Sequence, residues 1–487
     1  MVVVVVHGFV LPFHDNKKIV LKSAHNEYFS IAPMMGHTNR HYHSYIHDML
    51  FSHIQDVIHL YTEMIPASTI VRLAGESPEY GGGNRPEATL ELQHLLQKSV
   101  PEVTLQLGGR NGAVVAEAAY IAYTHFGYTS INLNCGCPSL PVTVGGTTNN
   151  NCGGAALMKD AAHVVDMIEQ IAAVIPPQQV DLSIKHRLGI RFDYDTYQPP
   201  SNSYEDDKEE KEAYESCFEF ANAIASTKVI QRIQVHARLA LLAQPENDHT
   251  NLKNGKVDHS RVQYREKQKA RLATITNRSA PPLRPTIVER VASSLQGKVQ
   301  VITNGGIQTT QQSYQRLEND QISGVMVGRA FINHPCSFTN LEPNKLLSLS
   351  SNSHEIIPPP PTTTIKKIPT RGQVMQDYIY YCRKQEEEEF YKNQKNREEL
   401  TKKLVAVPFS LFVGKEGHDA YQRTIRKLVQ KKISTMSTEG ILQAALQHIP
   451  DDVLYDQLVT DTTITDIDND KYALGTKRSG PLQRMIW

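Results

Sequence analysis

The sequence has little of what marks secreted, membrane-spanning or strongly charged proteins. Its six cysteines are spread over 487 residues without the spacing of a disulfide framework, which favours a reducing compartment. No apolar run approaches the roughly 20 residues of a membrane-spanning helix. Basic and acidic residues number 51 each, so the formal net charge is zero and any basic surface must be local. These absences predict a cytoplasmic protein without a membrane partner, although work inside an organelle stays open.

Several familiar motifs are absent as well. The first residues, MVVVVVHGFVLPF, lack the basic region and the small-residue cleavage site of a targeting signal, so we expect an N-terminal strand or an ordered tail. Heptads, repeats and zinc-finger spacings are missing. No G-x-G-x-x-G follows an early strand, which disfavours the alternative of a doubly wound open sheet.

What the sequence does contain is a regular alternation of short apolar runs and helical patterns from residue 28 to about 335. The eight runs are 28–35, 57–64, 103–109, 130–136, 181–187, 229–238, 298–306 and 322–329. Amphipathic segments lie between several of them, and the one at 113–127 closes on a glycine. Eight strands alternating with helices predict an α/β fold, a (β/α)₈ TIM barrel over residues 1–342.

The C-terminal end of each run is polar or rich in glycine. These ends are Met35, Glu63, Gln106, Asn134, Lys185, His236, Asn304 and Arg329. In a barrel the C-terminal ends of all strands line one mouth, where sites are built. We therefore expect the site at this mouth.

Three segments interrupt the barrel pattern or follow it. Residues 199–212 are acidic, and we interpret them as a solvated insertion. A second insertion, at 243–275, carries seven basic and two acidic residues between 252 and 271. Residues 343–370 are rich in proline and serine and predict a linker.

The remaining 371–487 are helical and charged and end in a C-terminal tail. Eleven basic residues face four acidic ones between 390 and 432, which suits either a solvated helix face or a phosphate-backbone contact.

The last two strands carry a phosphate-binding pattern. In barrels, phosphate often sits on the loops after strands seven and eight, and here these read Asn304-Gly305-Gly306 and Gly328-Arg329. Glycine lets the backbone approach an anion closely, and arginine adds a planar, charged donor fork.

A flavin suits the polar residues that end three other strands. A cation such as Lys185 stabilises the negative charge of a reduced flavin near N1, and an amide such as that of Gln106 pairs with the ring edge. His236 completes the set. A core ion pair for the lysine and a hydrogen-bonded core imidazole for the histidine stay open as alternatives.

Two cysteines, Cys135 and Cys137, stand at the end of the fourth run. Gly136 and Pro138 end the strand, so Cys137 should lie in a loop above the mouth, while Cys135 is a small strand residue. The loop that follows is long and rich in Gly, Thr and Asn, as mobile active-site loops are. Zinc bound by these thiols with Cys152 is a weaker alternative, because the spacing is unusual.

Nine collinear motifs across about 300 residues resemble the tRNA-dihydrouridine synthase family, most closely its bacterial A-type branch. They are 32-APMM-35, 60-LYTEM-64, 105-LQLGG-109, 131-INLNCGCPS-139, 153-GGAALM-158, 184-IKHRLGI-190, 235-VHARLA-240, 304-NGGI-307 and 324-GVMVGR-329. A looser similarity joins 407–428 to the helical tRNA-binding domain of the family. In 36-GHTNRH-41, His37 replaces a usual aromatic residue and Asn39 a usual acid, which bears on the target uridine and not on the reaction.

The resemblance implies an FMN-dependent oxidoreductase that uses NADPH to reduce a D-loop uridine of tRNA, at position 20/20a. It implies Cys137 as the proton donor. The implied FMN contacts are Pro33, Met34, Met35, Gln106, Lys185, His236, Asn304, Gly305, Gly306, Gly328 and Arg329. The implied substrate contacts are Asn134, Arg238, Arg278 and Arg423. We expect tRNA as the partner and no stable protein partner.

Two other functions stay open on the sequence. One is a flavin barrel enzyme acting on a free small molecule, which would not need the basic helical domain. The other is a non-catalytic RNA-binding protein on the same fold.

Overall fold

The computed structural model describes residues 5–6, 9–10, 27–139, 142, 153–193, 196–242, 276–277, 281–350, 368–388 and 393–458. The chain divides into two compact units, each drawing on separate stretches of sequence. The first unit comprises 1–26, 64–75 and 104–306, and the second comprises 27–63, 76–103 and 307–487. Each unit is described by itself below.

The strands of the first unit are parallel neighbours in the order β12, β10, β8, β7, β6, β5. Their bounds are β5 Ile65–Pro66, β6 Val103–Gly108, β7 Ser130–Cys135, β8 Asp181–Arg187, β10 Arg232–His236 and β12 Gln300–Asn304. The register places Lys185 of β8 beside both Asn134 and Gln234. It also places His236 beside Asn304. Polar residues from neighbouring strands therefore lie at the same heights of the sheet.

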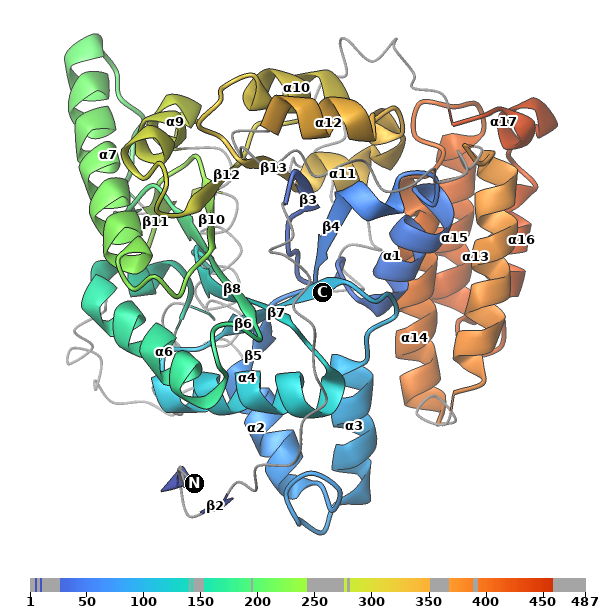
Figure 1. The fold of residues 1–487 in the computed structure, drawn as a ribbon. Coiled ribbons are helices and arrows are strands. Elements are labelled where there is room, and N and C mark those ends of the chain that lie inside the picture. Colours follow the sequence, from blue (N-terminus) through green and yellow to red (C-terminus); the bar gives the residue numbers. More distant parts are fainter. Residues whose placement is uncertain are drawn as a thin grey trace, which may run out of the picture. The chain divides into compact units, whose positions relative to one another are not determined.

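The strands of the second unit are also parallel, in the order β13, β3, β4. They span Gly324–Val327, Phe29–Ile31 and Ile58–Tyr61. Three residues separate β4 from β5, so these two short strands share the second of the eight predicted positions. Within the described ranges, all eight predicted strand positions are present, and the fold is the predicted closed parallel barrel with helices around it (Figure 1).

The helices of the first unit follow the expected pattern. They are α2 Ala67–Glu76, α4 Gly112–Phe126, α6 Ala161–Val174, α7 Ser203–Ala225 and α9 Pro285–Ser294, with the short η3 at Gly154–Lys159. Asn111 caps the start of α4 by accepting from the N–H of Val114. Gly127 ends α4 at φ 65°, a left-handed conformation that glycine adopts without strain. The predicted helix stop at this glycine is confirmed. A small parallel pair that the sequence did not predict, β9 Ile190–Arg191 with β11 Ala240–Leu241, lies outside the barrel sheet.

The acidic segment 199–212 corrects one expectation. From Ser203 onward it is the N-terminal half of α7 and not an insertion between elements, although most of its side chains are exposed as expected. Asn202 caps this helix by accepting from the N–H of Glu205. The carboxylate of Glu209 is buried with only 6% of its surface exposed, although the segment around it is mostly charged.

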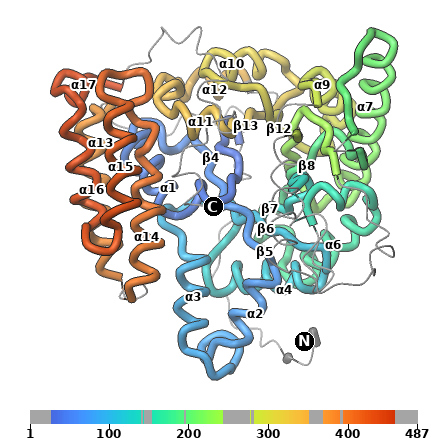
Figure 2. Tube along the Cα trace, turned by 180° about the vertical axis from the view of Figure 1, so that it is seen from behind, coloured from blue at the N-terminus to red at the C-terminus, as the bar shows by residue number. Residues whose placement is uncertain are grey.

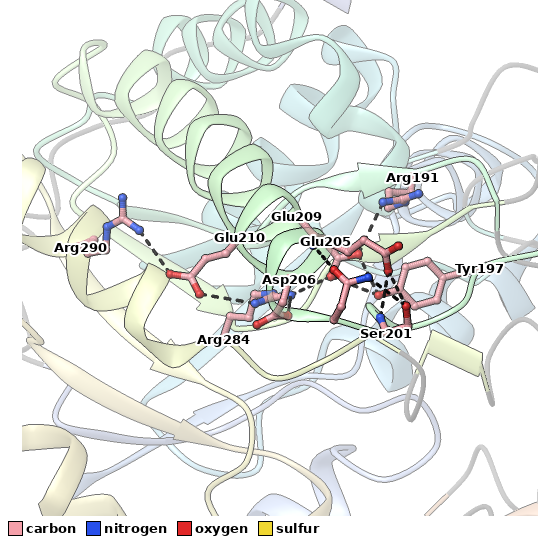
Figure 3. A network of polar contacts seen from close by, with 10 residues as sticks. Arg191, Tyr197, Ser201, Glu205, Asp206, Glu209, Glu210, Arg284 and Arg290 are labelled. Atoms are coloured by element: carbon pink, nitrogen blue, oxygen red, sulfur yellow. Dashed lines mark hydrogen bonds and ion pairs between the residues drawn. The ribbon is translucent and has the colours of Figure 1, made fainter.

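Figure 3 shows why the carboxylates of α7 are placed there. Arg284, which precedes α9, donates to Asp206 at 2.6 Å and to Glu209 at 3.0 Å. The hydroxyl of Tyr197 donates to Glu209 at 3.0 Å. Arg191 of β9 lies 3.5 Å from the same carboxylate. Buried charges need partners, and this network supplies them by joining α7 to α9 and to β9.

The second unit carries most of the remaining helices. Those up to residue 350 are α1 Arg40–Ser44, η1 Tyr45–Leu50, η2 Gln55–Val57, α3 Pro86–Leu96, α10 Thr310–Leu317, α11 Arg329–Asn333, η4 Pro335–Phe338 and α12 Pro343–Ser350. The predicted linker 343–370 thus begins as the helix α12, in which Leu346 is fully buried. Residues 351–367 lie outside the described residues.

The C-terminal part is helical, as predicted, as far as it is described. Its helices are α13 Arg371–Glu386, α14 Gln394–Ala406, α15 His418–Lys432, α16 Thr438–Leu446 and α17 Asp451–Tyr455. Helices α13 to α16 pack side by side (Figure 2). Close to the chain start, β1 Val5–Val6 pairs antiparallel with β2 Phe9–Val10. None of the helices in the described ranges combines the length and apolar character needed to cross a membrane.

Within the second unit, the C-terminal helices pack against the start of the barrel. Tyr45 and Tyr378 meet edge to face with ring centroids 5.3 Å apart. The ring of His41 shares a hydrogen bond of 2.8 Å with the hydroxyl of Tyr381. Arg40 donates to Glu388. Segments about 340 residues apart in the sequence are therefore packed together.

Glu209→Ala should lower the free energy of unfolding by about 3 kcal/mol, because it removes one buried partner of Arg284 while Asp206 remains. Urea denaturation measures the change. Lys208→Ala, one residue earlier and exposed, is the control, and its effect should stay within about 0.5 kcal/mol. Equal effects of the two changes would contradict a stabilising role for the network.

Candidate active site

Cys135 and Cys137 have different surroundings. Strand β7 ends at Cys135, whose side chain is fully buried, and burial raises the pKa of its thiol to about 12. This confirms the prediction that Cys135 belongs to the strand. Cys137 follows in the loop and is partly exposed. Gly136 and Cys137 are called the thiol turn below.

Asn134, the last inward-facing residue of β7 before the thiol turn, holds that turn. Its Oδ1 accepts from the N–H of Gly136 at 3.1 Å and from the N–H of Cys137 at 3.0 Å. On the other side, the carbonyl of Cys137 accepts from the N–H of Ala155 at 2.9 Å. Gly154 makes this approach possible, because a Cβ at that position would lie 2.5 Å from the Cys137 carbonyl oxygen. The thiol turn is thus attached to the barrel strand β7 and to η3.

A chain of buried amides fixes the orientation of Asn134. Its Nδ2 donates to Oε1 of Gln106 at 3.0 Å, and Nε2 of Gln106 donates to Oδ1 of Asn132 at 2.7 Å. Asn132 then donates to Ser183 and to Gln234, each at 2.9 Å. Because each amide donates at one end and accepts at the other, the chain determines which atom of Asn134 faces the thiol turn.

Lys185 brings a cation to the same part of the first unit. Its Nζ donates to Oδ1 of Asn304 at 3.2 Å. Burial, and after it the positive charge of Arg187, lower the pKa of Lys185 to about 8, while a charge on Cys137 acts in the opposite direction. The lysine is therefore held in an electrostatic setting that an anion would relieve.

The backbone after β12 turns in a way that suits an anion. Gly305 and Gly306 have φ values of 112° and 75°. A Cβ at Gly305 would lie 2.8 Å from Cδ2 of His236, and one at Gly306 would lie 2.8 Å from Cδ1 of Leu283. Only glycine fits these conformations and contacts, so the backbone comes close to the imidazole of His236 at Gly305 and to the side chain of Leu283 at Gly306.

In the second unit, the loop after β3 carries three predicted cofactor contacts. Pro33 and Met34 are partly exposed, and Met35 is half exposed. Thr38 stabilises this loop by accepting from the N–H of Met34 at 2.9 Å. Glu63 accepts from the N–H of Gly36 at 2.6 Å. Large apolar side chains are thus presented to solvent on a well-bonded loop.

The loop after β13 presents the predicted phosphate donor. Arg329 is exposed and begins α11 directly after Gly328. A Cβ at Gly328 would come within 3.7 Å of Cβ of Ala32 and 4.0 Å of Sδ of Met34. The two predicted loops of the second unit therefore lie next to each other.

The predicted substrate residues divide into three groups. Asn134 bonds to the thiol turn, as described above. The guanidinium of Arg238 donates to the carbonyl of Pro281. Arg423 lies exposed on α15. Arg278, Cys152 and the insertion 243–275 lie outside the described residues.

The sequence analysis missed four polar residues on the inner side of the barrel. They are Asn132, Ser183, Arg187 and Gln234. Each stands two positions from a residue that was singled out, on the same side of its strand, so the period of two would have found them. Within the described ranges, no three His, Cys, Asp or Glu side chains are grouped to hold a metal ion.

These contacts define a chemical site in the first unit. A partly exposed thiol lies on a turn held by buried amides, with Lys185 near it, and that lysine donates to Asn304, which directly precedes the glycine turn. Such a set suits an anionic redox cofactor and the transfer of one proton.

A model of the dihydrouridine synthase (Dus) family matches residues 30–408. The chain belongs to the dihydrouridine synthase family. Similar members of that family are each named "tRNA-dihydrouridine(20/20a) synthase". The protein of Synechocystis is 27% identical over 421 residues, covering 86% of this chain and 93% of its own. That of Xylella fastidiosa is 30% identical over 327 residues, covering 65% and 73%. That of a strain of Escherichia coli is 26% identical over 307 residues, covering 63% and 69%.

In this dihydrouridine synthase family member, iodoacetamide at pH 8 should alkylate Cys137 at least about tenfold faster than Cys135. The thiolate is the nucleophile, and Cys135 is both buried and poor in thiolate because its pKa is raised. Peptide mapping by mass spectrometry measures the two rates. In denaturant the rates should converge, and equal rates in the native protein would contradict the placement of the two thiols.

Proposed function

We propose that this protein is a tRNA-dihydrouridine synthase that reduces the C5=C6 bond of D-loop uridine, at position 20/20a. The observation that carries the proposal is the setting of Cys137. Its thiol is partly exposed, its turn is held by Asn134, and Lys185 lies close to it. The names of the similar proteins support the substrate and the position. tRNA is the proposed partner, and the cytoplasm remains the predicted place of action.

FMN is the proposed cofactor, with NADPH as its reductant. When bound, reduced FMN supplies the hydride that adds at C6 of uracil. The residues present in the first unit fit such a group. Lys185 has a pKa lowered by burial, which an anion would restore, and the glycine turn after β12 leaves no room for a Cβ. The proposed contacts there are Gln106, Lys185, His236, Asn304, Gly305 and Gly306. Those proposed in the second unit are Pro33, Met34, Met35, Gly328 and Arg329.

Cys137 is the proposed general acid. The C5=C6 bond of uracil is conjugated to the C4 carbonyl, so hydride addition at C6 leaves an enolate that must take a proton at C5. The S–H bond of Cys137 breaks, its proton goes to C5, and the thiolate that remains is stabilised by the positive charge of Lys185. Asn134 and Arg238 are proposed to hold the base, and a second hydrogen on Nδ2 of Asn134 gives it a donor beyond the bond to Gln106.

The helical part is proposed to bind the tRNA backbone. On α15, Arg423, Lys427 and Lys431 are spaced four residues apart and are all exposed, so they form one basic stripe. Phosphate contacts of this kind give affinity without reading sequence. Unstacking the target uridine so that it can enter the site costs a few kcal/mol, and this cost is lower in a tRNA loop than in a duplex.

Cys137→Ala should retain FMN but lose dihydrouridine formation by about 100-fold or more, because the enolate then has no positioned acid. The assay incubates unmodified tRNA with purified protein and NADPH and maps dihydrouridine by mass spectrometry. Cys135→Ala, a change at a buried thiol, is the matched control and should keep most of its activity. Wild-type turnover by Cys137→Ala would contradict the role of Cys137 as proton donor. Reduction of free uridine but not of tRNA by the wild type favours an enzyme for small molecules.

The affinity for FMN should depend on the charge of Lys185. Because its pKa is lowered to about 8, the lysine is charged at pH 7 and mostly neutral at pH 9, so the Kd for FMN should rise by up to about tenfold across that range. Fluorescence quenching of FMN measures this. Lys185→Met should bind weakly and without the pH dependence, while Lys211→Met, at an exposed lysine of α7, should behave as wild type. A pH-independent wild type would contradict the assignment.

A further inference from the structure

Arg187 is a buried cation for which the proposed mechanism has no use. It is the last residue of β8, on the same side of the strand as Lys185, and only 6% of its surface is exposed. Its Nε donates to the carbonyl of Gly136 at 3.0 Å. Its Nη1 donates to the carbonyl of Leu239 at 2.8 Å. One guanidinium therefore bridges two loops that follow different strands, β7 and β10.

The bond to Gly136 completes the attachment of the thiol turn. The two N–H groups of the turn already donate to Asn134, and the carbonyl of Cys137 accepts from Ala155. With Arg187, all four backbone polar groups of Gly136 and Cys137 have a partner. A turn with every backbone group bonded has little freedom left, so the direction of the thiol depends on these three partners.

The bond to Leu239 attaches the segment that carries Arg238. Next to Arg187 along the chain, the N–H of Leu188 donates to the carbonyl of Arg238 at 3.2 Å. The consecutive carbonyls of Arg238 and Leu239 thus both accept hydrogen bonds from residues at the end of β8, namely Leu188 and Arg187. The main chain at Arg238, a proposed uridine contact, is fixed relative to the thiol turn through residues 187 and 188.

Only arginine suits this bridge. Its planar group presents several N–H donors in a fixed fork, so two carbonyls on different loops are held at a set separation. Lysine would keep the charge but would offer a single, flexible ammonium group. Loss of the side chain would leave the carbonyls of Gly136 and Leu239 without these donors.

We propose that Arg187 is a positioning residue, which sets the thiol turn against the Arg238 segment so that the proton donor and the uridine-binding arginine keep one geometry. The proposal deepens the proposed function and rests on it for the roles of Cys137 and Arg238. The contacts themselves do not depend on the reaction.

Two changes separate the fork of Arg187 from its charge. Arg187→Met removes both, and Arg187→Lys removes the fork alone. Arg290→Met, at a half-exposed arginine of α9 in the same unit, is the matched control. Circular dichroism and thermal melting show whether each variant is folded.

The first readout is the rate at which iodoacetamide alkylates Cys137, with Cys135 as the internal reference. Both Arg187 variants should change the rate for Cys137 at least about threefold, because the turn gains freedom, and Arg290→Met should not. The second is turnover on tRNA, where kcat should fall about 10- to 100-fold while the KM for tRNA stays within about threefold. A rise in KM with unchanged kcat would show that Arg187 serves binding and not positioning.

The third readout reports the charge alone. The positive charge of Arg187 lowers the pKa of Lys185, so its removal should move the loss of FMN affinity to higher pH in Arg187→Met. Arg187→Lys should keep the wild-type pH dependence although its turnover falls. If Arg187 only stabilised the fold, Arg187→Lys would not lower the turnover while leaving the pH dependence of FMN affinity unchanged.

The proposal is overturned if folded Arg187→Met alkylates and turns over as wild type, or if Arg187→Lys restores both. Where Arg187→Met does not fold, Arg187→Lys alone decides, by loss or retention of the two rates. If wild type makes no dihydrouridine, the proposed function fails, and the alkylation rates still decide whether Arg187 holds the thiol turn.

Discussion

The arrangement of this barrel mouth depends on one carboxamide oxygen. Oδ1 of Asn134 accepts two consecutive backbone N–H groups, those of Gly136 and Cys137, and so converts the end of a strand into a tight turn. Where the chain leaves a parallel strand, its backbone N–H groups have no partner in the sheet, and water would otherwise accept hydrogen bonds from them. Here a side chain from the strand itself satisfies them, and the thiol is placed at a fixed height above the sheet.

The interior below that turn is polar where many barrels are filled with branched apolar side chains. Gln106, Asn132 and Gln234 are almost fully buried, and each is bonded to another polar side chain. A buried amide chain is stable only when every member finds its partner, since an unpaired buried amide is costly. Its geometry is therefore stiff, and a change in one amide propagates to Asn134. The support of the thiol turn thus begins well inside the barrel.

Much of the barrel could be predicted from the sequence, because the periods of strands and helices and the glycine stops are local signals. All eight strand positions and the stop at Gly127 followed from them. The start of α7 could not be predicted this way, since its charged composition hides the helical period and its partner, Arg284, lies far along the chain. The loop position of Cys137 could be predicted because glycine and proline mark the end of the strand before it. The contacts of Arg187 could not be predicted, because its two partners are backbone carbonyls that only the folded chain brings within hydrogen-bonding distance.

The second unit is composed of the beginning and the end of the chain. The pair Arg40–Glu388 and the pair His41–Tyr381 join residues 348 and 340 positions apart. During synthesis on the ribosome, α1 must therefore wait for most of the polypeptide to emerge before it acquires these neighbours. Contacts between residues so far apart in the sequence form slowly. The second unit can thus be completed only after its C-terminal helices have been synthesised.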